Sequence, residues 1–282
     1  MRVIVTGASG FIGRNVLLRA PRDWEITAVY HRADVLEAFV AAHGLSHHVT
    51  PVRCDLMNPA DMAGLTQAVG GRADAVLNFL EHCPVDHVVY VSSGAVYDGL
   101  TGPVSPSTAV APRLPYAISK LASEQYVRFF AERRHAVGSY INVRFFGAYG
   151  PYEPLRKITT RWMRAVMDGQ RQLTVRGDGE NLIDFMYVDD AVDGFLTLAA
   201  AAGATGTVDF ASGAPISVNE VVRTMGRTLG VEIALSHDGH SEEYILFRTV
   251  DAAMSERFGV RPKIPFADGV ARLQQFLASQ AV

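Results

Sequence analysis

Cysteine is scarce in this sequence of 282 residues, which has only Cys54 and Cys83. They form no Cys-x-x-Cys pair and no disulfide framework, so a reducing cytoplasm is the expected location. There is no block rich in Lys and Arg, and the formal net charge is −3. We therefore expect neither nucleic acid nor a membrane surface as a partner. No apolar run is long enough to span a bilayer, and no signal segment precedes the first strand. No metal-ligand set is complete, so no metal is expected.

The first thirty residues contain a phosphate-binding pattern. The stretch "RVIVTGASGFIG" places a short buried strand before glycines in the spacing G-x-x-G-x-x-G, and an amphipathic helix follows. Glycines at such a turn let a pyrophosphate approach the free N–H groups of a helix N-terminus. A strand–turn–helix with glycines kept for tight packing is the plainer alternative. The predicted cofactor contacts here are Gly7, Gly10, Phe11, Ile12 and Gly13.

A carboxylate is missing at the end of the second predicted strand, Ile26–Tyr30, where His31 and Arg32 follow instead. An acidic residue at this point usually binds the free ribose hydroxyl of NAD, whereas an arginine accommodates the 2′-phosphate of NADP. The only nearby acid, Asp34, falls in the next predicted helix. We therefore expect NADP(H) to be favoured over NAD(H), with His31 and Arg32 at the phosphate.

Further strands are predicted up to Asp55, at 87–91 and in "SYINVRFFGAYGP", which indicates an α/β fold with a doubly wound parallel sheet. The stretch 75–86 does not fit this scheme. A strand at 75–79 would leave seven residues before the next strand, too few for a parallel crossover. Either residues 75–82 are helical and a strand has been lost, or a segment is missing here, and we favour the second.

Tyr116 and Lys120 lie four positions apart at the start of a predicted helix and therefore share one face. An ammonium beside a phenol favours phenolate, as an acid/base tyrosine requires. By itself the pair is weak evidence, because Tyr-x-x-x-Lys occurs by chance in many helices.

Six motifs in fixed order resemble the extended short-chain dehydrogenases/reductases, specifically the NAD-dependent epimerase/dehydratase family that acts on nucleotide-diphosphate sugars. They are "TGASGFIG" at 6–13, "CDL" at 54–56, "VSSGAVY" at 91–97, "YAISK" at 116–120, "RFFGAYGP" at 144–151 and "GDGENLIDFMYVDD" at 177–190. The resemblance covers nearly the whole chain. It implies a Rossmann-type domain at 1–146, with return segments near 185–211, and a substrate domain mainly at 147–282.

The resemblance also implies roles for individual residues. Tyr116 is the implied acid/base, Lys120 holds the nicotinamide ribose and lowers the tyrosine pKa, and Ser93 shares the substrate oxygen. Further cofactor contacts are implied for Asp55, Leu56, Ser92, Tyr116, Lys120 and Phe146. Substrate contacts are implied for Ser93, Gly94, Gly147 and Arg248. A homodimer and a place in polysaccharide biosynthesis follow from the same likeness.

Departures from the family pattern narrow the chemistry. Gly94 and Ala95 stand where sugar dehydratases carry an Asp-Glu pair, so a 4,6-dehydratase is not expected. Gly147 and Ile183 replace a substrate-binding Asn and an Arg near the diphosphate. The function expected first is reduction of an NDP-4-keto-6-deoxyhexose. C4 epimerisation of an NDP-sugar is the first alternative, and a catalytically silent nucleotide-binding or sensor protein is the second.

Overall fold

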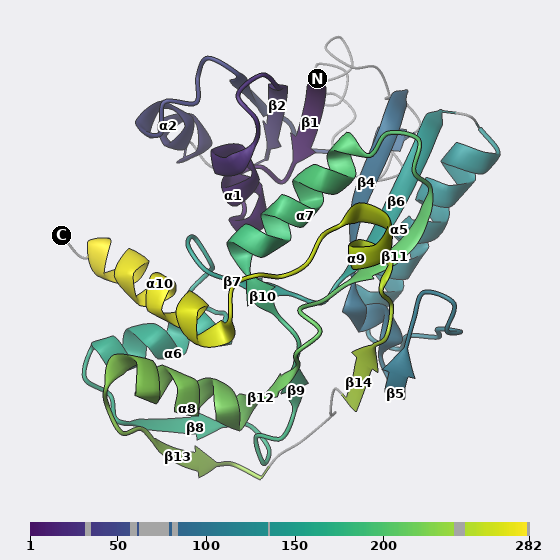
Figure 1. Ribbon diagram of the computed structural model, residues 1–282. Coiled ribbons are helices and arrows are strands. Elements are labelled where there is room, and N and C mark those ends of the chain that lie inside the picture. The colour runs from purple at the N-terminus through teal and green to yellow at the C-terminus, as the bar shows by residue number, and fades with distance from the viewer. Residues whose placement is uncertain are drawn as a thin grey trace. The chain divides into compact units, whose positions relative to one another are not determined.

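A computed structural model describes residues 1–31, 35–56, 61, 79–80, 84–134, 136–239 and 246–280 (Figure 1). The chain divides into two compact units, which we describe separately. The first contains Met1–Ser92, Ser119–Val143 and Val192–Thr207. The second contains Ser93–Ile118, Arg144–Ala191 and Val208–Val282. The domain boundary expected at residue 147 stays a prediction.

The first unit opens with alternating strands and helices. These are β1 (Arg2–Thr6), α1 (Phe11–Arg19), β2 (Glu25–Tyr30), α2 (Val35–Ala42) and β3 (Val49–Arg53). The strands form a parallel sheet in the order β1-β2-β3. Apolar side chains of β2 are buried in it, among them Ala28 and Val29. Such continuous burial is typical of a parallel strand covered on both faces.

Two long strands and a long helix complete the part of this unit that bears on the site. They are β4 (Val85–Ser93), β6 (Val137–Phe145) and α5 (Pro115–Glu132). A second sheet has the order β11-β6-β4, with β11 at Gly206–Phe210. The helix packs on these strands through Val127 and Phe130, which share a buried cluster with Val137 and Tyr140. The first residues of α5 and the last of β4, β6 and β11 belong to the second unit.

The second unit is built from short strand pairs and helices. Its helices are the 3-10 turn η1 (Gly94–Tyr97), α6 (Ile158–Met167), α8 (Val218–Leu229), α9 (Ala253–Phe258) and α10 (Phe266–Ser279), and α7 (Val188–Ala200) starts here and ends in the first unit. Its strands are β5 (Thr101–Val104), β7 (Ala148–Tyr149), β8 (Gln172–Val175), β9 (Leu182–Ile183), β10 (Met186–Tyr187), β12 (Ile216–Ser217), β13 (Ala234–His237) and β14 (Leu246–Thr249). They pair as β5-β14, β7-β10, β8-β13 and β9-β12.

The predicted α/β class is confirmed, and most predicted elements lie close to their expected positions. The third strand ends at Arg53, two residues before the expected Asp55. Most of the troublesome stretch 75–86 lies outside the described residues, so the predicted missing segment stays a prediction. Within the described ranges, no helix is both long and apolar enough to cross a membrane.

Candidate active site

The glycine-rich turn between β1 and α1 is where the sequence predicts a phosphate-binding cradle. Gly7 has φ +66°, a conformation that favours glycine, and its carbonyl accepts a hydrogen bond from Gly10 N at 2.9 Å. A Cβ atom at Gly13 would lie 2.4 Å from that same carbonyl oxygen. Gly10 precedes α1 in extended conformation and provides no side-chain cap to the helix. Close backbone packing and uncapped helical N–H groups fit a dinucleotide pyrophosphate at this point.

The end of β2 faces a carboxylate from the neighbouring strand. His31 Nε2 lies 3.2 Å from Asp55 Oδ2. Asp55 reaches this place because Cys54, just before it, donates its backbone N–H to the Tyr30 carbonyl at 2.8 Å. Leu56 packs against the buried pair Val29 and Cys54. Arg32 lies outside the described residues.

Lys120 is turned towards the carboxyl end of β4. Its Nζ donates to the Val91 carbonyl at 2.8 Å and lies 5.2 Å from the centre of the Tyr90 ring. Burial lowers the pKa of this ammonium group, because a low-dielectric environment disfavours the charged form. Tyr116 lies one turn earlier on α5 with 58% of its surface exposed. The predicted acid/base is therefore accessible, while its predicted partner is half-buried.

Ser92 is buried and engaged within the protein. Its Oγ donates to Glu124 Oε1 at 2.5 Å, and Asn142 Nδ2 donates to the Glu124 backbone carbonyl at 3.3 Å. Glu124 lies on α5 one turn after Lys120 and is 2% exposed. A buried carboxylate requires a donor such as the Ser92 hydroxyl to remain stable. The sequence analysis did not find Glu124, although its spacing of four from Lys120 was a usable signal.

Ser93 and the start of α5 are tied together within the second unit. Ser93 precedes η1, and its Oγ accepts a hydrogen bond from Ala95 N at 3.1 Å. Asp98 follows η1 directly. Its Oδ2 accepts the backbone N–H groups of Arg113 at 2.9 Å and Leu114 at 3.3 Å. The turn that carries Ser93 is thereby linked to the residues that lead into the helix of Tyr116.

The predicted substrate contacts occupy different surroundings. A Cβ atom at Gly94 would lie 3.0 Å from the ring of Phe146, so these two predicted residues touch. Gly147 has φ +146°, and a Cβ atom there would lie 3.5 Å from Phe185. Arg248 is exposed on β14, in register with Pro103 of β5.

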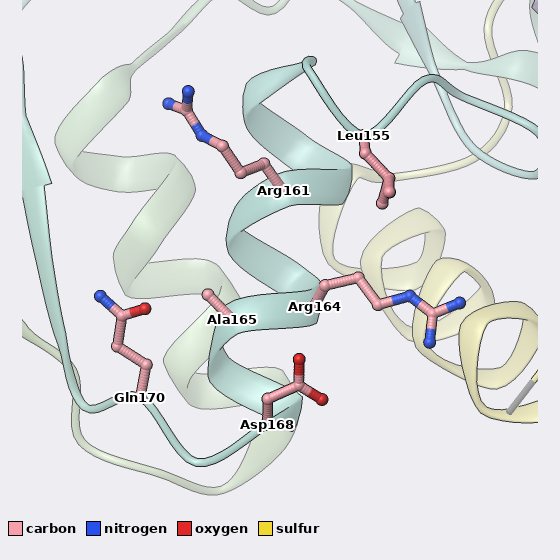
Figure 2. A pocket seen from close by; sticks show the side chains of 6 residues that line it. All are labelled: Leu155, Arg161, Arg164, Ala165, Asp168 and Gln170. Carbon is pink, nitrogen blue, oxygen red and sulfur yellow. The ribbon is translucent and has the colours of Figure 1, made fainter.

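A surface hollow of about 470 Å³ lies elsewhere in the second unit, along α6. Figure 2 shows its six lining side chains, Leu155, Arg161, Arg164, Ala165, Asp168 and Gln170. None of them belongs to the predicted site. In the ranges that the structure describes, no group of three His, Cys, Asp or Glu side chains is arranged to hold a metal ion.

The glycine-rich turn, the spacing of Tyr116 and Lys120 and the Ser93 turn are features of this α/β chain that the resemblance to extended short-chain dehydrogenases/reductases implies. The sequence model of the NAD dependent epimerase/dehydratase family matches residues 3–82 and 70–209, which is more than half of the chain. The chain belongs to this family. The predictions of family, fold class and enzyme are confirmed.

Individual relatives are distant in sequence but similar over most of their length. The "Uncharacterized UDP-glucose epimerase YtcB" of Bacillus subtilis is 26% identical, over 69% of this chain and 71% of the relative. A dTDP-glucose 4,6-dehydratase of Streptomyces griseus is also 26% identical, over 95% and 92%. A solved structure of UDP-glucuronic acid 4-epimerase from Bacillus cereus, in complex with NAD, has a TM-score of 0.83 at 20% identity and covers 99% of this chain and 97% of that one.

The predicted preference for NADP(H) is wrong. The family is described as NAD dependent, and the similar Bacillus cereus structure contains NAD. A carboxylate does stand near the end of β2, because Asp55 Oδ2 lies 3.2 Å from His31 Nε2. A carboxylate there suits a ribose hydroxyl and repels a 2′-phosphate. The sequence predicts Asp55 as a cofactor contact, but the preference for NADP(H) is argued from His31 and Arg32 alone.

Proposed function

We propose that this chain is an NAD-dependent C4 epimerase of a nucleotide-diphosphate sugar. The observation that carries the proposal is the Asp98 tie, which links the Ser93 turn to the start of the helix bearing Tyr116 and Lys120. The glycines Gly7, Gly10 and Gly13 would hold the dinucleotide, together with Phe11, Ile12, Asp55 and Leu56. Relatives named for UDP sugars support uridine as the nucleotide.

In this mechanism the proton at the sugar O4 atom is moved by the protein. The Tyr116 oxygen takes this proton as the C4 carbon becomes a ketone, and returns it when the opposite hydroxyl forms. Ser93 Oγ already accepts from Ala95 N, so its own O–H is available to donate to the same oxygen. The Lys120 charge favours the phenolate form of the tyrosine. When bound, NAD supplies acceptance and return of a hydride.

The residues after Ser93 also support this choice. Gly94 and Ala95 offer no carboxyl group to remove water from the sugar, whereas epimerisation through a ketone requires none. We assign the substrate contacts to Ser93, Gly94, Gly147 and Arg248. Ser92 and Phe146 are assigned to the cofactor side. Ser92 would act through the strand end that it anchors to Glu124.

Reduction of an NDP-4-keto-6-deoxyhexose is the second candidate. The same Ser93, Tyr116 and Lys120 would serve it, because reduction is one half of the epimerase cycle. It differs in needing fresh reduced cofactor for every turnover, whereas an epimerase retains its cofactor. This difference makes the two candidates separable by experiment.

We also propose a homodimer in a reducing cytoplasm, active in polysaccharide biosynthesis. An apolar stripe follows one side of α5, where Leu114, Ile118, Tyr126 and Phe129 are each 42–49% exposed. Their spacing places them along one helical face. The same helix of a second copy is the partner that would cover this stripe.

The test measures conversion without added reductant. The purified protein is incubated with UDP-glucose, UDP-glucuronic acid or UDP-N-acetylglucosamine, and the C4 epimer is detected by NMR. We expect at least one substrate to be converted when NAD is present in much smaller amounts than the sugar. In Tyr116→Phe the rate of conversion should fall by at least about 1,000-fold. Tyr126→Phe, on the same helix, is the control and should retain activity. Conversion that persists in Tyr116→Phe would refute the mechanism. Stoichiometric NADH consumption with a 4-keto sugar would favour the reductase.

A further inference from the structure

The turn that carries Ser93 ends at a buried tyrosine, Tyr97, whose hydroxyl bonds to two charged residues. The Tyr97 hydroxyl donates to Asp209 Oδ1 at 2.8 Å and Oδ2 at 3.0 Å. Arg144 Nη1 donates to the Tyr97 oxygen at 3.0 Å, and its guanidinium carbon lies 5.1 Å from the centre of the tyrosine ring. Thr249 Oγ1 donates to Asp209 Oδ2 at 2.6 Å. All four residues lie within the second unit.

Asp209 is the centre of this network. It is 2% exposed, and burial raises its pKa to about 6. The hydroxyls of Thr249 and Tyr97 and the charge of Arg144 act in the opposite direction. Asp251 is the remaining charged neighbour, and its carboxylate accepts the Asp209 backbone N–H at 2.8 Å. Near pH 8 the Asp209 carboxylate is therefore charged and accepts from both hydroxyls.

The network controls one end of a very short element. Only Gly94, Ala95 and Val96 separate Ser93 from Tyr97. At the other end, Phe146 lies so close to Gly94 that a Cβ atom there would be 3.0 Å from its ring. Phe146 is itself fixed, because its N–H donates to the carbonyl of Phe210, the neighbour of Asp209 in β11, at 3.0 Å. Movement at Asp209 would therefore reach both Tyr97 and Phe146.

We propose that Asp209, acting through Tyr97, is the positioning residue that fixes the turn carrying the Ser93 hydroxyl. This inference rests on the proposed function for the role of Ser93. Asp209 itself makes no contact with the reacting oxygen in this assignment. Its effect on rate arises from where it holds Ser93, since misplacement of a catalytic group by about 1 Å can cost up to about 100-fold.

The kinetic test uses Asp209→Asn and Tyr97→Phe, with Tyr140→Phe as the control. Tyr140 is also a buried tyrosine near a carboxylate, Glu132, but it belongs to the first unit. We expect kcat to fall about 10-fold in both test variants while KM changes less than about 2-fold. The control should retain wild-type kcat. NAD titration gives the fraction of each variant that is folded and can bind the cofactor. If kcat falls only in proportion to this fraction, the loss comes from unfolding and the proposal is overturned.

A double-mutant cycle separates positioning from general stability. In the Ser93→Ala background, Asp209→Asn should reduce kcat no further, because its target hydroxyl is already absent. Independent, multiplying losses would overturn the proposal. The failure of the proposed function is recognised separately, by turnover that survives Tyr116→Phe.

Amide hydrogen exchange of the peptide spanning residues 93–98 tests the positioning role of Asp209 without any enzyme assay. We expect at least about 5-fold faster exchange in Tyr97→Phe and Asp209→Asn than in the wild type, because the turn loses its anchor. Tyr140→Phe should leave this peptide unchanged. Unchanged exchange in both test variants would refute the positioning role, whatever the substrate.

Discussion

Gly13 is the position where one added methyl group should do most harm to the cofactor cradle. The Cβ atom of an alanine there would lie 2.4 Å from the Gly7 oxygen, 2.6 Å from Ala8 Cα and 2.8 Å from the Ala8 oxygen. All three are backbone atoms, so no side chain can turn aside. Normal carbon contacts begin near 3.5 Å. The turn between β1 and α1 must therefore move by about 1 Å.

Two neighbouring glycines provide graded controls. A Cβ atom at Gly10 would lie 3.2 Å from the same Gly7 oxygen and needs a shift of a few tenths of an ångström. A Cβ atom at Gly7 would meet nothing within 4 Å, but φ there is +66°. We expect Gly7→Ala to lower the free energy of unfolding by about 1 kcal/mol through backbone strain. Gly10→Ala, at the helix cap, should lower it by at most about 1 kcal/mol. Gly13→Ala should cost about 3 kcal/mol through overpacking against backbone.

Urea denaturation and NAD titration measure the two consequences. The free energy of unfolding should fall in the order wild type, then Gly10→Ala and Gly7→Ala, then Gly13→Ala. The last variant should also bind NAD at least about 10-fold more weakly, since the displaced turn is the proposed pyrophosphate site. If Gly13→Ala unfolds at the same urea concentration as Gly10→Ala, the turn accommodates the methyl group and the steric reasoning is wrong.

Three further outcomes can be checked. Burial raises the pKa of Glu153 to about 7, so the stability that comes from its protonated form is complete below about pH 4.5 and is lost as pH rises through 7. Between these pH values the unfolding free energy of the wild type, measured by urea titration, should fall by up to about 3 kcal/mol relative to that of Glu153→Gln. The control variant Glu232→Gln changes an exposed residue and should follow the wild type. Ser92→Ala removes a donor from buried Glu124 and should cost about 1–3 kcal/mol in thermal unfolding; an unchanged Tm would contradict the importance of that bond. Light scattering should show that Phe129→Asp is a monomer, because the change places a charge on the apolar stripe. A wild type that is itself monomeric would refute the proposed dimer.

Local features of the fold could be predicted from the sequence because neighbouring residues determine them. The helix beginning at Phe11 follows from the glycine spacing, and α8 begins where Ser217 and Glu220 predict it. Ser217 Oγ accepts the Glu220 N–H at 3.2 Å, as a capping pair requires. Trp162 and Met163 of α6 are buried.

Contacts between distant residues escaped prediction. Tyr97 and Asp209 are 112 positions apart, and Ser92 and Glu124 are 32 apart. No local pattern joins such pairs, because the strand order that brings them together is a property of the whole sheet. The contact of His31 with Asp55 has the same origin, since it depends on the pairing of β2 with β3.

The last three residues of β4 show how this protein can change during evolution. Val91 offers a carbonyl to Lys120, Ser92 points to buried Glu124, and Ser93 begins the turn. Because side chains alternate along a strand, inserting a single residue inside β4 would exchange the burial of the two serines and disable the site. A change in length before Val85 leaves that alternation intact. Natural variation in loop length should therefore accumulate ahead of this strand and be purged within it.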